Sequence, residues 1–353
     1  MKEDGGFMAF ASLDEDKPID RSVWLQDAFP EWGTYLNKEI ENFVVEPNSF
    51  VLWWFGACAF FIKTPKTSIL IDNYSGPSAY TELEAGCGVC RQSGAESLNW
   101  MRLNPHVIDP FAIKTCDALL STHHHADHCD RYTVKPLIKN TEAIFIGPKA
   151  SCVKFERFGV PEKRMREVKP GDKIKIKDTE IVVLESADRT ALFTGRVLPK
   201  SMDEVCVTFL IKTPAGNIFH DGDSHYSNLF YKIGQQHEID VALLNMGENP
   251  PGVTDKTPVF ECYRIAEALG TKVLIPMHYD NWAIVQGDPF ELERIVRERA
   301  PHIKTVIMQW GGRFEYPKDQ DIKRYKYPDQ REKFRPEYSW QYGDKPRMPI
   351  HQI

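Results

Sequence analysis

Residues 121–128 read Ser-Thr-His-His-His-Ala-Asp-His and contain the pattern His-x-His-x-Asp-His. They directly follow a short apolar run that predicts a strand. In an extended turn at the end of that strand, His123 and His125 can point the same way, while Asp127 and His128 lie on the next bend. Imidazole and carboxylate ligands together suit divalent ions such as Zn, Mn or Fe. The segment therefore predicts a metal site, and the alternative is a solvated histidine-rich loop.

Two later segments also place polar side chains at strand ends. The run 218–220 is followed by Gly222 and Asp223, where a carboxylate that bridges two ions would sit, and the run 273–275 is followed by His278. Each has a simpler alternative, since a lone histidine is often a hydrogen-bonded core residue and Gly-Asp pairs are common in turns. Ligands collect beyond the C-terminal ends of strands in α/β sheets. The three segments together therefore predict one centre.

The secondary-structure pattern is mixed along the whole chain. Short apolar runs broken by Gly and Pro predict strands, and apolar residues at helical spacing predict helices. Strands are expected at 50–55, 59–62, 68–72, 118–121, 143–146, 180–186, 205–211, 218–220, 241–244 and 273–275. Helices are expected at 259–269 and 289–300, and a less regular one opens at 20–25. Because no linker separates strands from helices, we expect a single α/β domain.

Composition narrows the class of protein. The 353 residues are 42% hydrophobic, enough for a large core, and the net charge of −6 counts against a general nucleic-acid binder. The chain starts with a polar segment unlike a signal peptide and has no apolar run of membrane length, so we expect a cytoplasmic protein with no membrane partner. Eight cysteines without an export signal are expected to be reduced thiols. Cys87 and Cys90 form one CxxC without a partner pair, which favours free thiols over a zinc knuckle.

The chain resembles the metallo-β-lactamase superfamily. The segments 54–56 and 71–72 resemble its opening motif, and the histidine run, Gly222-Asp223 and Pro276-Met277-His278 match its later metal motifs in order. Within the superfamily, the chain is similar to the branch of ascorbate-6-phosphate lactonases over about residues 20–315. The segments that carry this closer similarity are 25–33, 107–113, 188–192, 222–228 and 247–250.

The resemblance implies a fold and a division of the chain. The fold would be a four-layer αββα sandwich, with two mixed sheets face to face and helices outside. Residues 49–316 would form this metallo-β-lactamase-like domain. Residues 1–48 would be an N-terminal helical extension, and residues 317–353 a C-terminal tail packed on the domain.

The resemblance also implies two neighbouring sets of metal ligands. His123 and His125 would hold one ion, Asp127, His128 and His278 a second, and Asp223 would bridge them. Most members have a histidine at the position that Asp188 takes here. A carboxylate there would favour Mn, with Zn as the alternative and one or two ions bound. Asp188 could instead form a surface ion pair with Arg189.

The implied activity is metal-dependent hydrolysis. The lactone ring of L-ascorbate 6-phosphate would open to 3-keto-L-gulonate 6-phosphate, with Asp127 and Asp223 as catalytic residues. A bound ion would lower the pKa of water from about 15.7 to about 7. Arg189, His225 and Lys256 are candidates for binding the phosphate, since it needs cationic donors, although each could be a solvated or capping residue.

Other functions are open to the same sequence. One is a phosphodiesterase or nuclease of the same fold, since fold does not determine function. Another is a metal-dead binding protein, which the intact ligands at three strand ends disfavour. The resemblance also implies a homo-oligomer that acts on a small phosphorylated sugar lactone and binds no nucleic acid.

Overall fold

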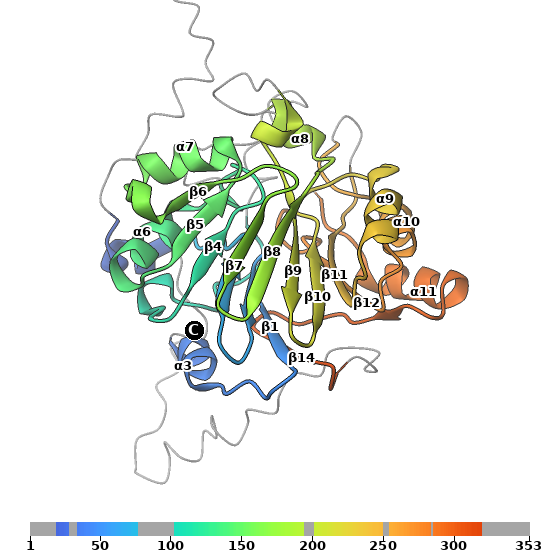
Figure 1. The fold of residues 1–353 in the computed structure, drawn as a ribbon, viewed down its shortest axis with the longest axis horizontal. Coiled ribbons are helices and arrows are strands. Elements are labelled where there is room, and N and C mark those ends of the chain that lie inside the picture. Colours follow the sequence, from blue (N-terminus) through green and yellow to red (C-terminus); the bar gives the residue numbers. More distant parts are fainter. Residues whose placement is uncertain are drawn as a thin grey trace, which may run out of the picture.

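A computed structural model describes residues 19–27, 34–76, 102–193, 201–249, 254–283 and 285–319 (Figure 1). Two sheets face each other at its centre, and helices cover the outer side of each. The predicted four-layer αββα sandwich is therefore confirmed. No helix in these ranges is both long enough and apolar enough to cross a membrane.

The first sheet has the strand order β14-β1-β2-β3-β4-β5-β6. Strands β14 to β3 of this order pair antiparallel, whereas β3 to β6 run parallel. The strands are β1 (Phe50–Trp54), β2 (Phe60–Lys63), β3 (Ser68–Ile71), β4 (Ala118–Leu120), β5 (Ile144–Gly147), β6 (Met165–Glu167) and β14 (Arg313–Tyr316). The helices that pack on its outer face are α3 (Tyr35–Asn42), α6 (Arg131–Asn140) and α7 (Lys149–Arg157). A further helix near the N-terminus is α2 (Arg21–Asp27).

The second sheet has the strand order β13-β12-β11-β10-β9-β8-β7. Strands β10 to β13 run parallel, and β7 to β10 pair antiparallel. The strands are β7 (Lys173–Ile176), β8 (Thr179–Leu184), β9 (Thr208–Thr213), β10 (Gly216–His220), β11 (Val241–Asn245), β12 (Val273–Met277) and β13 (Lys304–Thr305). Its outer face is covered by α9 (Leu229–Gln236), α10 (Val259–Leu269) and α11 (Pro289–Arg299), and the short α8 (Arg189–Phe193) follows β8.

Strand β1 shows why the apolar runs are continuous. Successive side chains of a strand point to opposite faces of the sheet. Phe50 and Leu52 point into the core between the two sheets, whereas Val51 and Trp53 point into the core beneath the outer helices. Both faces of the sheet are covered, so every residue of β1 is buried. Burying each such side chain stabilises the fold by about 1.5–3 kcal/mol.

Helix ends follow local capping rules. α11 begins at the predicted residue because the side chain of Asp288 accepts a hydrogen bond from the Phe290 amide. α10 ends where Gly270 takes a left-handed φ of 62°. The sequence pattern did not predict α6, which contains Pro136 in its interior. The Asp130 side chain caps α6 by accepting from the Tyr132 amide.

The sheets set the position of the candidate site. β3 and β4 are parallel neighbours in one sheet, and β10, β11 and β12 are parallel neighbours in the other. The segments that follow these strands therefore meet at one edge of the sandwich. The division of the chain into residues 1–48, 49–316 and 317–353 stays a prediction. Cys87, Cys90 and the tail from residue 320 lie outside the described residues.

Candidate metal centre

Side chains from both sheets meet beyond the C-terminal ends of their strands. The side chains of His123, His125, Asp127 and His128 follow β4, whereas Asp223 follows β10 and His278 follows β12. All six are buried. The residues are His123, His125, Asp127, His128, Asp223 and His278. The structure thus brings the histidine run together with the two later segments.

The first group of donor atoms comes from His123, His125 and Asp223, whose donor atoms lie within 4.8 Å of one another. His123 Nε2 is 2.8 Å from His125 Nδ1. On the other side of the ring, His123 Nδ1 lies 3.1 Å from the hydroxyl of Thr122, which itself donates to Asp72 at 2.6 Å. Thr122 can therefore only accept from His123 Nδ1–H, and Nε2 keeps its lone pair. Burial lowers the pKa of both imidazoles, and neighbouring histidines lower it further.

The second group surrounds the two Nε2 atoms of His128 and His278, which are 3.3 Å apart. Asp127 Oδ2 lies 3.6 Å from His128 Nε2 and 3.3 Å from His278 Nε2. Asp223 Oδ1 lies 3.4 and 3.3 Å from the same two atoms. Donors about 2.1 Å from one ion, at tetrahedral angles, are about 3.4 Å apart. These spacings therefore fit a shared divalent ion.

Asp72 orients this second group from behind. Its Oδ2 is 2.8 Å from Nδ1 of His128, and its Oδ1 accepts from the Thr122 amide at 2.8 Å. A histidine that gives its Nδ1 proton to a carboxylate presents its Nε2 lone pair to a metal. Asp72 itself has a positive φ of 45°, and this local strain is typical of functional sites.

A second strained segment supports His278. His278 has a φ of 67° and Ala57 a φ of 47°, and the His278 amide donates to the Ala57 carbonyl at 3.1 Å. The Ala57 amide donates to Asp280 Oδ1 at 3.0 Å, and Trp310 Nε1 donates to Asp280 Oδ2 at 2.6 Å. Residues distant in the chain thus fix the backbone of His278, which keeps the side chain in the centre.

The charges of the centre suit a cation. Burial alone would raise the pKa of Asp127 and of Asp223, but the neighbouring His128 and His278, joined at Asp223 by Lys256, outweigh it, and the pKa of each carboxyl is lowered. Burial would likewise lower the pKa of His128, but Asp223, Asp127 and Asp72 raise it well above its ordinary value. The carboxylates are therefore ionised, as metal ligation requires.

Asp188 is fully buried beside the centre and does not point to solvent. Its Oδ1 accepts from the Thr190 hydroxyl and the Ala191 amide, whereas its Oδ2 has no hydrogen-bond partner and lies 3.7 Å from His123 Nδ1. Burial and the charge of Asp223 raise the pKa of Asp188 to about 6. Among the described residues, neither Asp188 nor Asp127 belongs to the two sets of donor atoms that all lie within 4.8 Å of one another. An orphaned buried oxygen next to His123 fits a cation nearby.

Lys256 lies inside the centre and not on the surface. Its side chain is 1% exposed, and its Nζ is 2.8 Å from Asp223 Oδ2, 3.0 Å from Asp255 Oδ2 and 2.9 Å from His278 Nε2. Burial alone would lower the pKa of Lys256, but Asp223 and Asp255 outweigh it and the pKa is raised. The ammonium of Lys256 is therefore buried and engaged by side chains of the protein. The predicted role of Lys256 in binding the phosphate stays a prediction.

The other two predicted phosphate ligands flank the centre. Arg189 is exposed at the first position of α8, next to Asp188 in the chain. His225 is half-buried, two residues after Asp223, and both of its ring nitrogens are buried without a hydrogen-bond partner. The charge of His225 acts on Asp188 to lower its pKa, so the two side chains are close.

The sequence reasoning missed two residues of the site. Cys58 Sγ lies 3.6 Å from Asp223 Oδ1, and Cys58 forms a possible donor group with His128, Asp223 and His278. Burial and the charge of Asp223 raise the pKa of this thiol well above its ordinary value. Asn281 Nδ2 donates to Asp127 Oδ2 at 3.2 Å and so positions that carboxylate. The available signal was position in the sequence: Cys58 lies just after the segment 54–56, and Asn281 lies three residues after His278.

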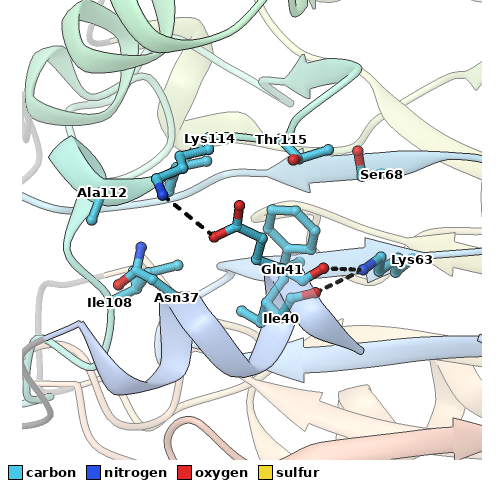
Figure 2. A pocket seen from close by; sticks show the side chains of 11 residues that line it. Asn37, Ile40, Glu41, Lys63, Ser68, Ile108, Ala112, Lys114 and Thr115 are labelled. Carbon is cyan, nitrogen blue, oxygen red and sulfur yellow. Dashed lines mark hydrogen bonds and ion pairs between the residues drawn. The ribbon is translucent and has the colours of Figure 1, made fainter. Parts of the chain in front are cut away.

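A small hollow lies elsewhere, between α3 and the first sheet (Figure 2). It is lined by Ser68 at the start of β3, so it is at the opposite edge from the centre. Lys63 donates from this hollow to the carbonyls of Ile40, at 2.7 Å, and Glu41, at 3.2 Å (Figure 2). It also donates to the carbonyl of Phe43 at 2.7 Å. Lys63 therefore donates to backbone carbonyls at the C-terminal end of α3, which is a structural role.

Comparison with known proteins identifies relatives over most of the chain. Residues 51–278 match the family described as "Beta-lactamase superfamily domain". A probable L-ascorbate-6-phosphate lactonase of Escherichia fergusonii is 42% identical over 331 residues, which cover 88% of this chain and 94% of that protein. The protein of the same description from Shigella flexneri is 41% identical, with the same coverage of both chains.

Solved structures share the fold at lower identity. A metallo hydrolase from Ignicoccus hospitalis has a TM-score of 0.54 and 19% identity, and covers 76% of this chain and 98% of its own. An isothiocyanate hydrolase from Delia radicum gut bacteria has a TM-score of 0.56 and 14% identity, and covers 75% of this chain and 98% of its own. At these identities the likeness extends to the fold alone.

Proposed function

Because the chain belongs to the metallo-β-lactamase superfamily, we propose that it is a metal-dependent lactonase that opens the ring of L-ascorbate 6-phosphate to 3-keto-L-gulonate 6-phosphate. The observation that carries the proposal is the 41–42% identity to probable L-ascorbate-6-phosphate lactonases over 88% of the chain. The buried donor set at one sheet edge supports it, since a metal-dead protein would have no need to keep these side chains together.

The proposed metal ligands are His123 and His125 for one ion and Asp127, His128 and His278 for a second, with Asp223 shared between them. A bound divalent ion supplies Lewis acidity and makes water more acidic. Asp127 and Asp223 are the proposed catalytic carboxylates. The amide of Asn281 holds Asp127. The orphaned Oδ2 of Asp188 supports a contribution from that residue to the shell of His123 and His125, and the resulting oxygen-rich set favours Mn over Zn.

The lactone substrate carries a phosphate, and the residues beside the centre offer it a binding place. Arg189 is exposed and can form a bidentate, charge-assisted pair with a phosphate. His225 has both ring nitrogens without a partner, so it can donate to the same group. Cytoplasmic location and a homo-oligomeric state belong to the proposal as well, on the strength of the composition and of the resemblance.

A substrate comparison tests the proposal. The purified chain, loaded in turn with Mn²⁺ and Zn²⁺, is assayed with L-ascorbate 6-phosphate and with a bis-aryl phosphodiester. We expect ring opening of the lactone, detected by the release of acid, and little hydrolysis of the diester. The opposite preference would assign the chain to the phosphodiesterases of the same fold, and no turnover of either with metal bound would reject the proposed substrate.

A further inference from the structure

Lys256 contacts two side chains of the centre, Asp223 and His278, and no role in substrate binding explains these contacts. Its ammonium is 2.8 Å from Asp223 Oδ2, while Oδ1 of the same carboxylate faces His128 and His278. One oxygen of the Asp223 carboxylate therefore pairs with Lys256, and the other faces the two histidines. The ammonium also lies 2.9 Å from His278 Nε2, and an ammonium can only donate, so it engages the lone pair with which His278 would bind a metal.

The chain around Lys256 is built to hold this side chain in place. The Asn249 amide side chain donates to the Lys256 carbonyl at 2.7 Å, and its Oδ1 accepts from the Lys256 amide at 2.9 Å. At Gly247, an added Cβ would lie 2.4 Å from the Val285 carbonyl oxygen and 2.9 Å from Cβ and Cγ of Lys256, so glycine lets the backbone pack closely against both Val285 and the lysine stem. Gly247 and Asn249 belong to the segment 247–250, which the sequence analysis singled out without a role.

We propose that Lys256 is a positioning residue for Asp223, whose fixed positive charge restrains the carboxylate to bind an ion through Oδ1 alone and limits the affinity of the centre for that ion. Two effects act in the same direction. The ammonium repels a divalent cation at the neighbouring donor atoms, and it competes with the cation for the lone pair of His278. Lys256 therefore lowers the affinity of the centre for the metal ion and at the same time holds Asp223 in one orientation.

This role predicts an unusual pair of changes in Lys256→Met. Without the ammonium, Asp223 Oδ2 is free to turn towards the ion, and the repulsion disappears. The dissociation constant for Mn²⁺ should therefore fall roughly tenfold or more. Turnover should fall at least tenfold with KM little changed, because the carboxylate has lost its orientation. A lysine that served only to stabilise the fold would weaken metal binding when removed.

The experiment measures Mn²⁺ binding from the spin-resonance signal of free Mn²⁺, with no substrate present. Lys256→Arg keeps the charge and should stay within about threefold of the parent. Lys272→Met is the matched control, since Lys272 also pairs with two carboxylates, those of Glu238 and Asp240, and it lies beside β11 and β12 at the opposite edge. It should bind Mn²⁺ as the parent does.

Unchanged or weaker Mn²⁺ binding in Lys256→Met would overturn the proposal. If that variant does not fold, Lys256→Gln and Asn249→Ala take its place, and both should bind Mn²⁺ more tightly. Unchanged binding in these two would equally overturn it. The kinetic part rests on the proposed lactonase activity, but the binding part does not, so a chain that binds metal as described and fails to open the lactone would reject the substrate alone.

Discussion

Replacing Asp72 by asparagine perturbs the centre without removing a metal ligand. Asp72 accepts three hydrogen bonds, from the Thr122 amide, the Thr122 hydroxyl and Nδ1 of His128. Asparagine has one oxygen and one NH₂ group, so at least one buried donor must face another donor. A buried donor without a partner costs about 1–3 kcal/mol, and a charge-assisted bond contributes about 1.5–3 kcal/mol. We expect Asp72→Asn to lower the free energy of unfolding by about 2–4 kcal/mol.

The same change should weaken metal binding by about 10–100-fold, because His128 loses the carboxylate that fixes its tautomer. Unfolding of the metal-free protein in urea measures the first effect, and titration with Mn²⁺ measures the second. Asp240→Asn is the control, since Asp240 is also buried and accepts from the Asn217 amide and the Tyr316 hydroxyl at the opposite edge. It should lose stability and keep its metal affinity. Equal Mn²⁺ affinity in Asp72→Asn and the parent would refute the reasoning.

Three further predictions follow from the geometry. Asp188→His should keep metal binding and shift preference towards Zn, as measured by metal analysis after competition, and unchanged selectivity would leave Asp188 outside the metal shell. Arg189→Ala should raise KM for the phosphorylated lactone about tenfold or more with kcat nearly unchanged, and an unchanged KM would exclude Arg189 from phosphate binding. Burial alone would raise the pKa of Asp178, but hydroxyl donors such as Thr67 lower it below its ordinary 3.8. The ionised carboxylate of Asp178 therefore stabilises the fold above pH 3.8, and this contribution is lost as the pH falls through the lowered pKa. Asp178→Asn should be less stable than the parent at pH 7. The difference in the free energy of unfolding, measured in urea, should narrow below pH 3.8.

Much of the fold could be predicted because local patterns coincide with burial. The apolar run of β1 predicted a strand, which is buried on both faces, and the helical spacing from residue 289 predicted α11. α6 escaped prediction because Pro136 interrupts its pattern, and its stability comes from tertiary packing of Val134 and Leu137 on the first sheet. The edge strand β14 pairs with β1 across more than 250 residues, and no local signal carries such a pairing.

The donor set of the centre could be predicted for a different reason. Metal ligands need particular side chains, and these stood at predicted strand ends in His125, Asp223 and His278. The supporting residues could not be found in this way, since their roles depend on which atom each side chain faces. Lys256 was predicted as a candidate phosphate ligand or a solvated lysine, and the fold instead encloses its ammonium between Asp223 and Asp255. Positions of this kind are set by tertiary packing, which spacing along the chain does not record.

The most direct test of the account is removal and return of the metal. The purified chain is stripped with a chelator, its metal content is measured, and its rate of ring opening on L-ascorbate 6-phosphate is followed as Mn²⁺ is added back. We expect activity to vanish on stripping and to return in proportion to the metal bound, and Asp127→Ala to stay inactive at every metal concentration. A stripped protein that opened the lactone at the full rate would contradict the account.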